Sequence, residues 1–476
     1  MTLCLPQDVG AEAWDFPAEL FDERVWHVAR PQPDPDAVDR AAALISAAEA
    51  PLIVAGGGVT YSDATGALAA FAEATGIPVA ETHAGKGSLP WDHPQSAGAV
   101  GATGNHAANA LAADADVVIG LGTRWSDFTT ASRSVFARDD VRFVNVNISA
   151  FDAAKHAGEM VTCDARAGLS ALTSALSGYR VPDDRQERLR GLQAAWNQTV
   201  DDAYAGRLTE PGRSIALDPG EAPPLEGARS LASQVEVIGV VNDVVADTDI
   251  VINAAGSMPG DLHKLWRSRD PQAYHVEYGF SCMGYEIAAG LGVKLAAPER
   301  HVVVLVGDGS YLMLATELVT AVAERLHLTV VLVQNHGYAS IGALSGSVGS
   351  ERFGTAYRYR NPATGRHDGD VLPVDLAANA ESLGARVVRA ADLPELRLAL
   401  QDALAGDDVC VIEIKTDPLR PGPDSLAWWD VPVAEVSELS ATRTARTGYE
   451  DDRKAQRPLI RPSGSTGRTP NNEEPT

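Results

Sequence analysis

Short apolar runs alternate along the chain with segments in which apolar residues recur at helical spacing. The runs predict buried parallel strands over residues 51–55, 78–81, 117–121, 141–148, 250–253, 302–306, 328–333 and 409–414. Helical spacing predicts helices over 35–49, 64–75, 186–205, 283–297 and 312–326. Because strands that alternate with helices are typical of α/β folds, the pattern predicts two doubly wound parallel-sheet domains.

The predicted elements also set the domain boundaries. Residues 1–34 combine a short strand at 2–9 with an acidic, Pro-rich connector. A Rossmann-like middle domain over 35–180 follows, and a helix and polar linker over 181–227 separate it from a second domain over 228–430. We expect 431–476 to be a C-terminal extension, largely disordered from 441 because it is polar and low in aromatic residues.

One stretch inside the second domain is unusual. Residues 345–371 are rich in Gly, Ser, Arg and Tyr, and they are too many and too polar for an ordinary connector. Loops of this length often carry function. We therefore predict a lid or a loop that contacts the substrate.

Residues 301–338 form a predicted βαβ unit. Since such crossovers are right-handed, the carboxyl ends of its two strands lie side by side at one edge of the sheet. Asp308 follows the first strand and Asn335 follows the second, while Gly307 and Gly309 allow a sharp turn between strand and helix. Carboxylate and amide oxygens are ligands that Mg²⁺ prefers, so we predict a metal site here.

The same edge offers groups for a diphosphate. The N–H groups of Ser310 and its neighbours begin a helix, which attracts anions, and a free carbonyl near Gly337 adds an oxygen for the metal. Taken alone, Gly-Asp-Gly is a common turn between a strand and a helix. With an Asn at the end of the next strand, however, the segment resembles the thiamin diphosphate signature. It is not a Walker loop, because no Gly-Lys-Ser/Thr follows.

A second glycine pattern, Gly56-x-Gly58, follows the strand at 51–55. Tyr61 occupies the place of the third glycine of a dinucleotide-binding fingerprint, and no acidic residue at the right distance completes it. The pattern favours a tight packing turn over a nucleotide site.

Composition narrows the class of protein. The 476 residues are 45% hydrophobic and 22% charged, which is typical of a soluble protein with two or three domains. The net charge of -25 disfavours binding to nucleic acids or anionic membranes. No apolar run has the length of a membrane span. Isolated cysteines fit reduced thiols of a cytoplasmic protein; they are Cys4, Cys163, Cys282 and Cys410.

Motifs spread over nearly the whole chain carry a closer resemblance. They are ETHAGKG at 81–87, GTRWSDFTT at 122–130, DLHKLWR at 261–267, VEYGFSCMGYEIAAGLGVKLA at 276–296, GDGSYLMLATEL at 307–318 and AWWDVPVAEVS at 427–437. Together they closely resemble the trihydroxycyclohexanedione hydrolases of inositol catabolism. Each motif alone separates this family poorly from acetolactate synthases and related decarboxylases.

The resemblance implies a thiamin diphosphate- and Mg²⁺-dependent enzyme that hydrolyses a carbon–carbon bond of 3D-trihydroxycyclohexane-1,2-dione, giving 5-deoxy-glucuronate. It implies a cyclic polyol diketone as substrate and a homo-oligomer, dimer or tetramer, for the full-length form. The metal ligands that it implies are Asp308, Asn335 and the Gly337 carbonyl. The diphosphate would be held by Gly256, Ser257, Met258, Gly307, Gly309 and Ser310.

Two further residues follow from the resemblance. Met283 matches the bulky residue that supports the bent cofactor, and the carbonyl of Ser281 matches the acceptor of the aminopyrimidine. The alternative for Met283 is a buried core methionine.

The sequence departs from the family pattern at two histidines. His83 stands where the family has Gln, and His336 where it has Arg, both on the expected substrate side. His336 is either a general acid or base, since its ordinary pKa lies near neutrality, or an exposed loop histidine, which we favour.

The N-terminal part of the chain departs further from the family pattern. The family carries a pyrimidine-binding domain whose glutamate activates the cofactor, and TLCLPQDV at 2–9 resembles only its closing strand. No residue here is named as that glutamate, so the catalytic residue is unknown. A start placed too late, a separate polypeptide and a truncated relative all stay open. We expect the chain alone to bind the cofactor weakly without useful ring opening, and an upstream-extended chain to be active.

Other functions stay open beside the hydrolase. Within enzymes the alternative is an acetolactate-synthase-like carboligase. In another class it is a noncatalytic thiamin diphosphate-binding subunit.

Overall fold

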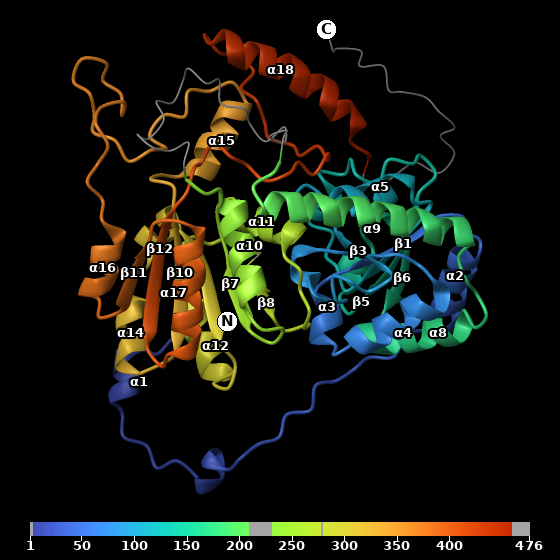
Figure 1. The fold of residues 1–476 in the computed structure, drawn as a ribbon. Helices are drawn as coiled ribbons and strands as arrows, with labels where there is room; N and C mark the ends of the chain where they lie inside the picture. Colours follow the sequence, from blue (N-terminus) through green and yellow to red (C-terminus); the bar gives the residue numbers. More distant parts are fainter. Residues whose placement is uncertain (1–2, 209–230, 278, 459–476) are drawn as a thin grey trace.

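The computed structural model describes residues 3–208, 231–277 and 279–458. It contains two six-stranded sheets, each covered by helices, that lie side by side in Figure 1. Every neighbouring pair of strands is parallel. The prediction of two doubly wound α/β domains is confirmed. Residues 209–227 of the helix and polar linker predicted over 181–227 lie outside the described residues.

The first sheet has the order β3-β2-β1-β4-β5-β6. Its strands are β1 Pro51–Ala55, β2 Val79–Glu81, β3 Ser96–Ala99, β4 Val117–Leu121, β5 Arg142–Asn147 and β6 Glu159–Thr162. One face packs on α2 (Pro35–Ser46), α4 (Thr65–Thr75) and α8 (Ala165–Ala175). The other face packs on α5 (His106–Asp114) and the long α9 (Asp183–Tyr204). Short helices follow several strand ends: α3 Gly57–Tyr61, α6 Asp127–Thr130 and α7 Ala150–Ala153.

The second sheet has the order β11-β12-β10-β9-β7-β8. Its strands are β7 Ile250–Asn253, β8 Tyr274–Val276, β9 Val302–Gly307, β10 Leu328–Gln334, β11 Arg386–Ala390 and β12 Val409–Lys415. The core on one face comes from α10 (Gln234–Val244), α11 (Met258–Leu265) and α17 (Leu393–Ala405). On the other face it comes from α12 (Tyr285–Ala296), α13 (Asp308–Met313), α14 (Glu317–Ala323) and α16 (Leu376–Ser382).

Two predicted elements are wrong. Within the strand predicted at 2–9, the described residues 3–6 are irregular and lead into a short helix, α1 (Gln7–Ala11), and none of residues 3–11 is buried. Without a neighbouring strand or a core, an extended apolar segment has no sheet to join. The single helix predicted over 312–326 is two helices, because Leu314 takes a non-helical conformation between α13 and α14. The strand predicted at 409–414 is confirmed as β12, which lies inside the sheet between β11 and β10.

The disordered tail predicted from 441 is also corrected for the described residues. Helix α18 (Ser440–Asp452) is tied to the rest of the molecule by polar contacts instead of a core. The Thr442 hydroxyl donates to the Gly349 carbonyl at 2.8 Å, and Tyr449 donates to Asp430 at 2.8 Å. Composition alone misses such an element, because its stability comes from hydrogen bonds to distant segments. Residues 459–476 lie outside the described part.

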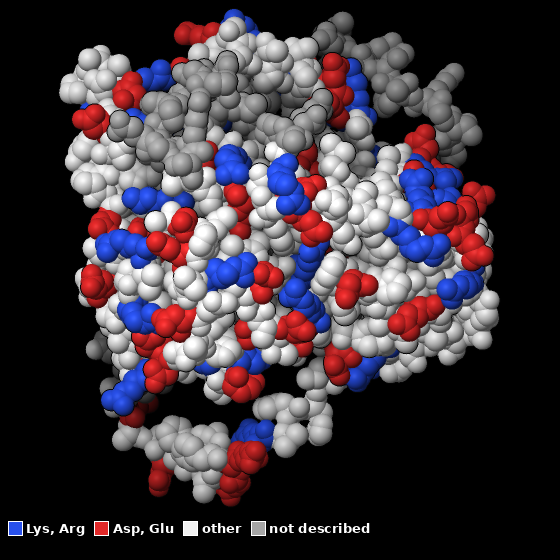
Figure 2. All heavy atoms as spheres, in the orientation of Figure 1, with Lys and Arg blue, Asp and Glu red and all other residues white. Residues whose placement is uncertain are grey.

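Charge is distributed evenly on the face drawn in Figure 2. Lys and Arg side chains alternate there with Asp and Glu, and no continuous basic patch forms on that face. Many of these side chains form ion pairs at the surface, such as Arg386 with Asp408 at 2.7 Å. Within the described residues, no helix combines the length and the apolar character that crossing a bilayer requires.

Candidate active site

The predicted site for the metal ion and the diphosphate, called the cradle here, comprises residues 256–258, 307–310, 335 and 337. It lies at the carboxyl edge of the second sheet, where the strand order reverses between β7 and β9. Ligands bind at such switch points in open α/β sheets. Asp308 follows β9 and is only 1% exposed. Its carboxylate accepts the N–H groups of Gly309 and Gly337, each at 3.0 Å. The second of these bonds joins the ends of β9 and β10, as the sequence predicted for a shared site.

Burial raises the pKa of Asp308 to about 6, although hydrogen bonds from nearby backbone N–H groups oppose the rise. A buried carboxylate with no cation beside it is costly, and a bound metal ion would remove that cost. Within the described residues no group of three or more His, Cys, Asp or Glu side chains gathers as a metal site. A metal at Asp308 therefore needs amide and carbonyl oxygens as its other ligands.

Asn335, directly after β10, provides such an oxygen. Its Oδ1 atom is buried and accepts no hydrogen bond from the described residues. A buried acceptor without a donor costs about 1–3 kcal/mol, so its presence calls for an unseen partner. A hard cation is a suitable partner for this oxygen and for the Asp308 carboxylate, since Mg²⁺ favours oxygen ligands. The residues present fit the metal that the sequence predicts.

Close packing explains the glycines around Asp308. A Cβ on Gly309 would lie 2.8 Å from the Tyr338 ring and 3.2 Å from the Met283 methyl carbon. A Cβ on Gly337 would lie 2.4 Å from the Thr355 carbonyl oxygen. The second contact brings the predicted lid segment, 345–371, against the cradle. The structure thus joins four separate stretches of the sequence around one site.

Met283 lies at the surface of this site and is 37% exposed, so its interpretation as a buried core methionine is wrong. The turn before it is organised by Glu277, whose carboxylate accepts the N–H groups of Phe280 at 3.0 Å and Cys282 at 2.7 Å. Ser281, in this turn, has a left-handed backbone with φ of 55°, and its hydroxyl donates to the Ala254 carbonyl at 3.2 Å.

The loop after β7 completes the cradle. Gly256 has φ of 83°, and among the described residues no atom beyond its two chain neighbours lies within 4 Å of the place where a Cβ would stand. The exposed Ser257 hydroxyl exchanges hydrogen bonds with the Gln234 amide. Met258 is 2% exposed and packs in the core, so it offers only its backbone to a ligand.

Sequence reasoning missed Glu286, which ties three parts of the cradle together. This α12 residue is 1% exposed. Its carboxylate accepts the N–H groups of Ala255 at 3.2 Å and Gly284 at 3.0 Å, and it also bonds the Ser310 side chain. Burial raises its pKa while these bonds lower it. The available signal was an acidic residue at the start of a helix of small and apolar residues.

Replacing Glu286 with Gln should leave at least one buried N–H group without an acceptor, because an amide presents one oxygen and one donor. We expect the free energy of unfolding to fall by about 1–3 kcal/mol and thiamin diphosphate to bind more weakly. Chemical denaturation and calorimetry measure the two effects. The exposed Glu299, in the turn that follows the same helix, is the matched control, and Glu299→Gln should change neither. Equal stabilities and equal cofactor affinities of the two variants would contradict a role of Glu286 in the cradle.

The two unusual histidines lie in different surroundings. His336 has φ of 63° and its Nε2 atom lies 3.1 Å from the Leu372 carbonyl oxygen. It is half-buried, which corrects the expectation of an exposed loop histidine, and burial lowers its pKa. His83 is 4% exposed and packs between the domains, where its ring stacks on that of His263 at 3.9 Å. His83 thus has no open face toward a substrate.

Comparisons with known proteins agree with this geometry. The family model described as the thiamine pyrophosphate enzyme central domain matches residues 38–172. The model described as the C-terminal TPP binding domain of these enzymes matches residues 254–414, which include the cradle.

Curated relatives match over most of the chain. A 3D-(3,5/4)-trihydroxycyclohexane-1,2-dione hydrolase of Geobacillus thermodenitrificans is 40% identical over 461 residues, covering 96% of this chain and 71% of the relative. A protein of the same name from Bacillus cereus is 40% identical, covering 94% of this chain and 70% of the relative. One from Clostridium tetani is 39% identical, covering 92% and 69%.

Proposed function

Because this chain belongs to the 3D-(3,5/4)-trihydroxycyclohexane-1,2-dione hydrolase family, we propose that it acts in myo-inositol degradation on the cyclic dione that its relatives are named for. The reaction is hydrolysis of a ring carbon–carbon bond, which gives 5-deoxy-glucuronate. Thiamin diphosphate and Mg²⁺ are the proposed cofactors. The observation that carries the proposal is the pairing of the buried Asp308 carboxylate with the donorless Asn335 oxygen at a sheet switch point.

Each cradle residue has a proposed role. Asp308, Asn335 and the Gly337 carbonyl hold the metal ion, which neutralises the diphosphate. Gly307, Gly309, Ser310 and the loop Gly256, Ser257 and Met258 enclose the diphosphate. Glu286 is a positioning residue, since it fixes Ala255, Gly284 and Ser310 relative to one another.

The remaining part of the site orients the cofactor's organic end. Met283 supports the bent shape, and the Ser281 carbonyl accepts a hydrogen bond from the aminopyrimidine. When bound, thiamin diphosphate supplies the electron sink for cleavage next to a carbonyl, and the protein supplies position and surroundings. The segment 345–371, which contacts Gly337 and Tyr338 through Thr355, excludes water from the reacting atoms.

The test is ring opening of the cyclic dione, followed by NMR detection of the deoxy-glucuronate. Family resemblance assigns cofactor activation to a carboxylate of a pyrimidine-binding domain. The assay therefore uses both this chain and a version with that domain of the Geobacillus relative fused ahead of it. We expect cofactor binding by both and turnover by the fused form, dependent on thiamin diphosphate and Mg²⁺. Acetolactate from pyruvate in place of ring opening would favour the carboligase, and cofactor binding without either product would favour a noncatalytic subunit.

Met283→Ala in the fused form should reduce turnover more than cofactor affinity. The side chain orients the reacting end of the cofactor and does not contact the metal ligands, and misplacement of reacting groups costs up to about 100-fold in rate. Steady-state rates and calorimetric cofactor affinities measure the two effects. Met160 on β6 is equally exposed, at 38%, and Met160→Ala is the matched control. Full turnover by Met283→Ala would show that Met283 does not orient the cofactor.

A further inference from the structure

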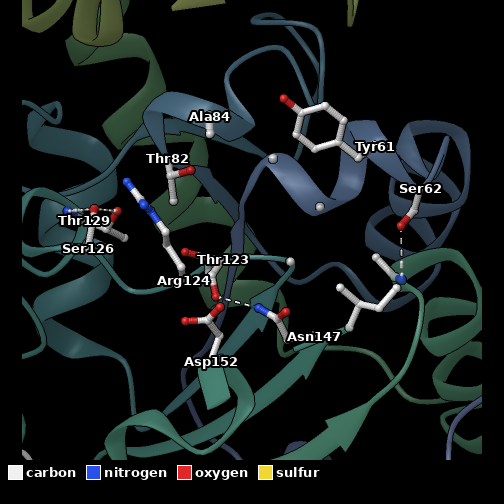
Figure 3. A pocket seen from close by; sticks show the side chains of 15 residues that line it. Tyr61, Ser62, Thr82, Ala84, Thr123, Arg124, Ser126, Thr129, Asn147 and Asp152 are labelled. Atoms are coloured by element: carbon white, nitrogen blue, oxygen red, sulfur yellow. Dashed lines mark hydrogen bonds between the residues drawn. The ribbon is translucent and has the colours of Figure 1, made fainter. Parts of the chain in front are cut away.

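The carboxyl edges of the two sheets differ in what lies against them. At the first sheet a hollow remains, shown in Figure 3, and Tyr61 beside it is 86% exposed. The glycines there serve packing, because a Cβ on Gly58 would lie 2.6 Å from the Gly122 Cα atom, which confirms the packing interpretation of Gly56-x-Gly58. At the second sheet the lid segment, 345–371, lies against the cradle instead.

A short antiparallel pairing fixes the lid segment to the loop that follows β10. The Tyr338 N–H donates to the Thr355 carbonyl at 2.8 Å, and the Tyr357 N–H donates to the His336 carbonyl at 3.1 Å. The Tyr357 ring also meets the rings of His336 and Tyr338 edge to face, with centroids 5.4 Å and 5.6 Å away. The backbone and the rings thus hold Tyr357 in one place relative to the proposed metal ligands.

This aromatic cluster is directed at the cradle. The Tyr338 ring packs on Gly309, where a Cβ would lie 2.8 Å from it. Tyr357 is 8% exposed, and burial raises its pKa, followed by the negative charge of Asp308. Because the effect of a charge declines with distance, the Tyr357 hydroxyl lies on the side of the lid segment that faces Asp308.

The Tyr357 hydroxyl is a buried donor without an acceptor. Among the described residues it forms no hydrogen bond. The Tyr338 hydroxyl also raises the pKa of Tyr357, but it is not placed to form a hydrogen bond with it. Buried polar groups are normally paired, so this hydroxyl calls for an acceptor that enters the cradle. Next to the Asn335 oxygen, which suits a cation, the site therefore offers an O–H group that suits an anion.

We propose that the Tyr357 hydroxyl donates a hydrogen bond to the diphosphate of the bound cofactor. The inference rests on the cofactor site proposed above and adds a contact that comes from the lid segment. Through this bond the cofactor and the lid segment stabilise each other, since the same segment is already paired with the loop of the metal ligands.

Calorimetry with Tyr357→Phe tests the proposal in the full chain. The substitution keeps the ring and removes only the O–H group. We expect the affinity for thiamin diphosphate in the presence of Mg²⁺ to fall by about tenfold, as for the loss of a hydrogen bond to a charged group. Inorganic pyrophosphate with Mg²⁺ should weaken by the same factor, because the lost contact is with the diphosphate. Tyr359→Phe is the matched control: it lies two residues further along the same segment, is 52% exposed, and should leave both affinities unchanged.

Thermal unfolding separates this contact from a structural role. Without cofactor, Tyr357→Phe should unfold at the same or a higher temperature than the parent, because it removes a buried hydroxyl that has no partner. The rise in unfolding temperature that thiamin diphosphate and Mg²⁺ produce should be smaller in the variant, since a weaker ligand stabilises less. A purely structural role predicts the opposite pattern, a loss of stability without cofactor and an unchanged rise with it.

The outcomes distinguish this contact from the cofactor site itself. Equal affinities of the parent and Tyr357→Phe would overturn the contact and leave the cradle standing. Weaker thiamin diphosphate with unchanged pyrophosphate would also overturn it, because the hydroxyl would then act on the organic end of the cofactor. A parent chain that binds neither probe would overturn the cradle and the contact together.

Discussion

Asp308→Ala should abolish Mg²⁺-dependent binding of thiamin diphosphate, with a loss of more than about 100-fold in affinity. The variant removes the charged ligand of the proposed site and leaves the diphosphate poorly neutralised. Calorimetry with and without Mg²⁺ measures the effect. In the parent chain the metal should strengthen cofactor binding, and in the variant it should have no influence.

Asp308→Asn separates the metal role from a structural role. The carboxylate accepts hydrogen bonds from Gly309 and Gly337, and an asparagine oxygen retains one acceptor for them. Since burial raises the pKa of Asp308, its charge is costly in the protein without metal. We therefore expect Asp308→Asn to unfold at a similar or higher temperature than the parent and still to lose cofactor binding.

Asp249 provides the matched control for that experiment. It is also buried, at 4% exposure, and it accepts the Ala246 N–H at 2.8 Å, but it precedes β7 at the opposite edge of the same sheet. Asp249→Asn should cost stability and leave cofactor affinity unchanged. Undiminished Mg²⁺-dependent binding by the Asp308 variants would rule out the cradle as the cofactor site.

The strands that sequence analysis found and those it missed differ in one physical respect. Central parallel strands are buried on both faces, so β1, β4, β9, β10 and β12 are continuous apolar runs that can be recognised without a structure. The missed strands β3, β6, β8 and β11 are the edge strands of the two sheets. With one neighbour each, they need no long apolar run: β3 is Ser-Ala-Gly-Ala, and β11 is mostly half-exposed.

Part of the active site could also be predicted from the sequence. Asp308 and Asn335 follow adjacent parallel strands, so strand order alone brings them to one edge of the sheet. Glu286 acts through contacts with segments far apart in the sequence, and periodicity carries no information about such contacts. The same limit applies to the polar contacts between the domains, where the partners of His83 come from elements that sequence analysis could not pair.

His83 and His263 form the centre of that contact. The Thr103 hydroxyl lies 2.7 Å from His83 Nε2 and 3.0 Å from His263 Nδ1, and His263 Nε2 lies 3.2 Å from the Glu81 carbonyl oxygen. Burial, together with the smaller effects of the Lys86 and Lys264 charges, lowers the pKa of His83 to about 3. The pKa of His263 is also lowered, first by burial and then by its histidine neighbour. Both rings are therefore uncharged in the folded protein at neutral pH.

This contact should make the protein sensitive to acid. In the unfolded chain a histidine takes up a proton near pH 6.5, whereas the folded protein keeps His83 neutral down to about pH 3. The unfolded state thus binds more protons between these values, so stability is fully present above pH 6.5 and declines as the pH falls. One such histidine contributes a slope of about 1.4 kcal/mol per pH unit.

His83→Gln should remove that slope while preserving a polar side chain of similar size. We expect the free energy of unfolding of the parent to fall more steeply than that of the variant from pH 6.5 to pH 4, with the curves differing by about 1.4 kcal/mol per pH unit. Urea denaturation at several pH values measures the free energy of unfolding of both proteins. His93→Gln is the control, because this histidine pairs with the exposed Glu73 at 3.3 Å and lies outside the interdomain contact. Parallel curves for the parent and His83→Gln would mean that His83 is already protonated, or open to water, in the folded protein.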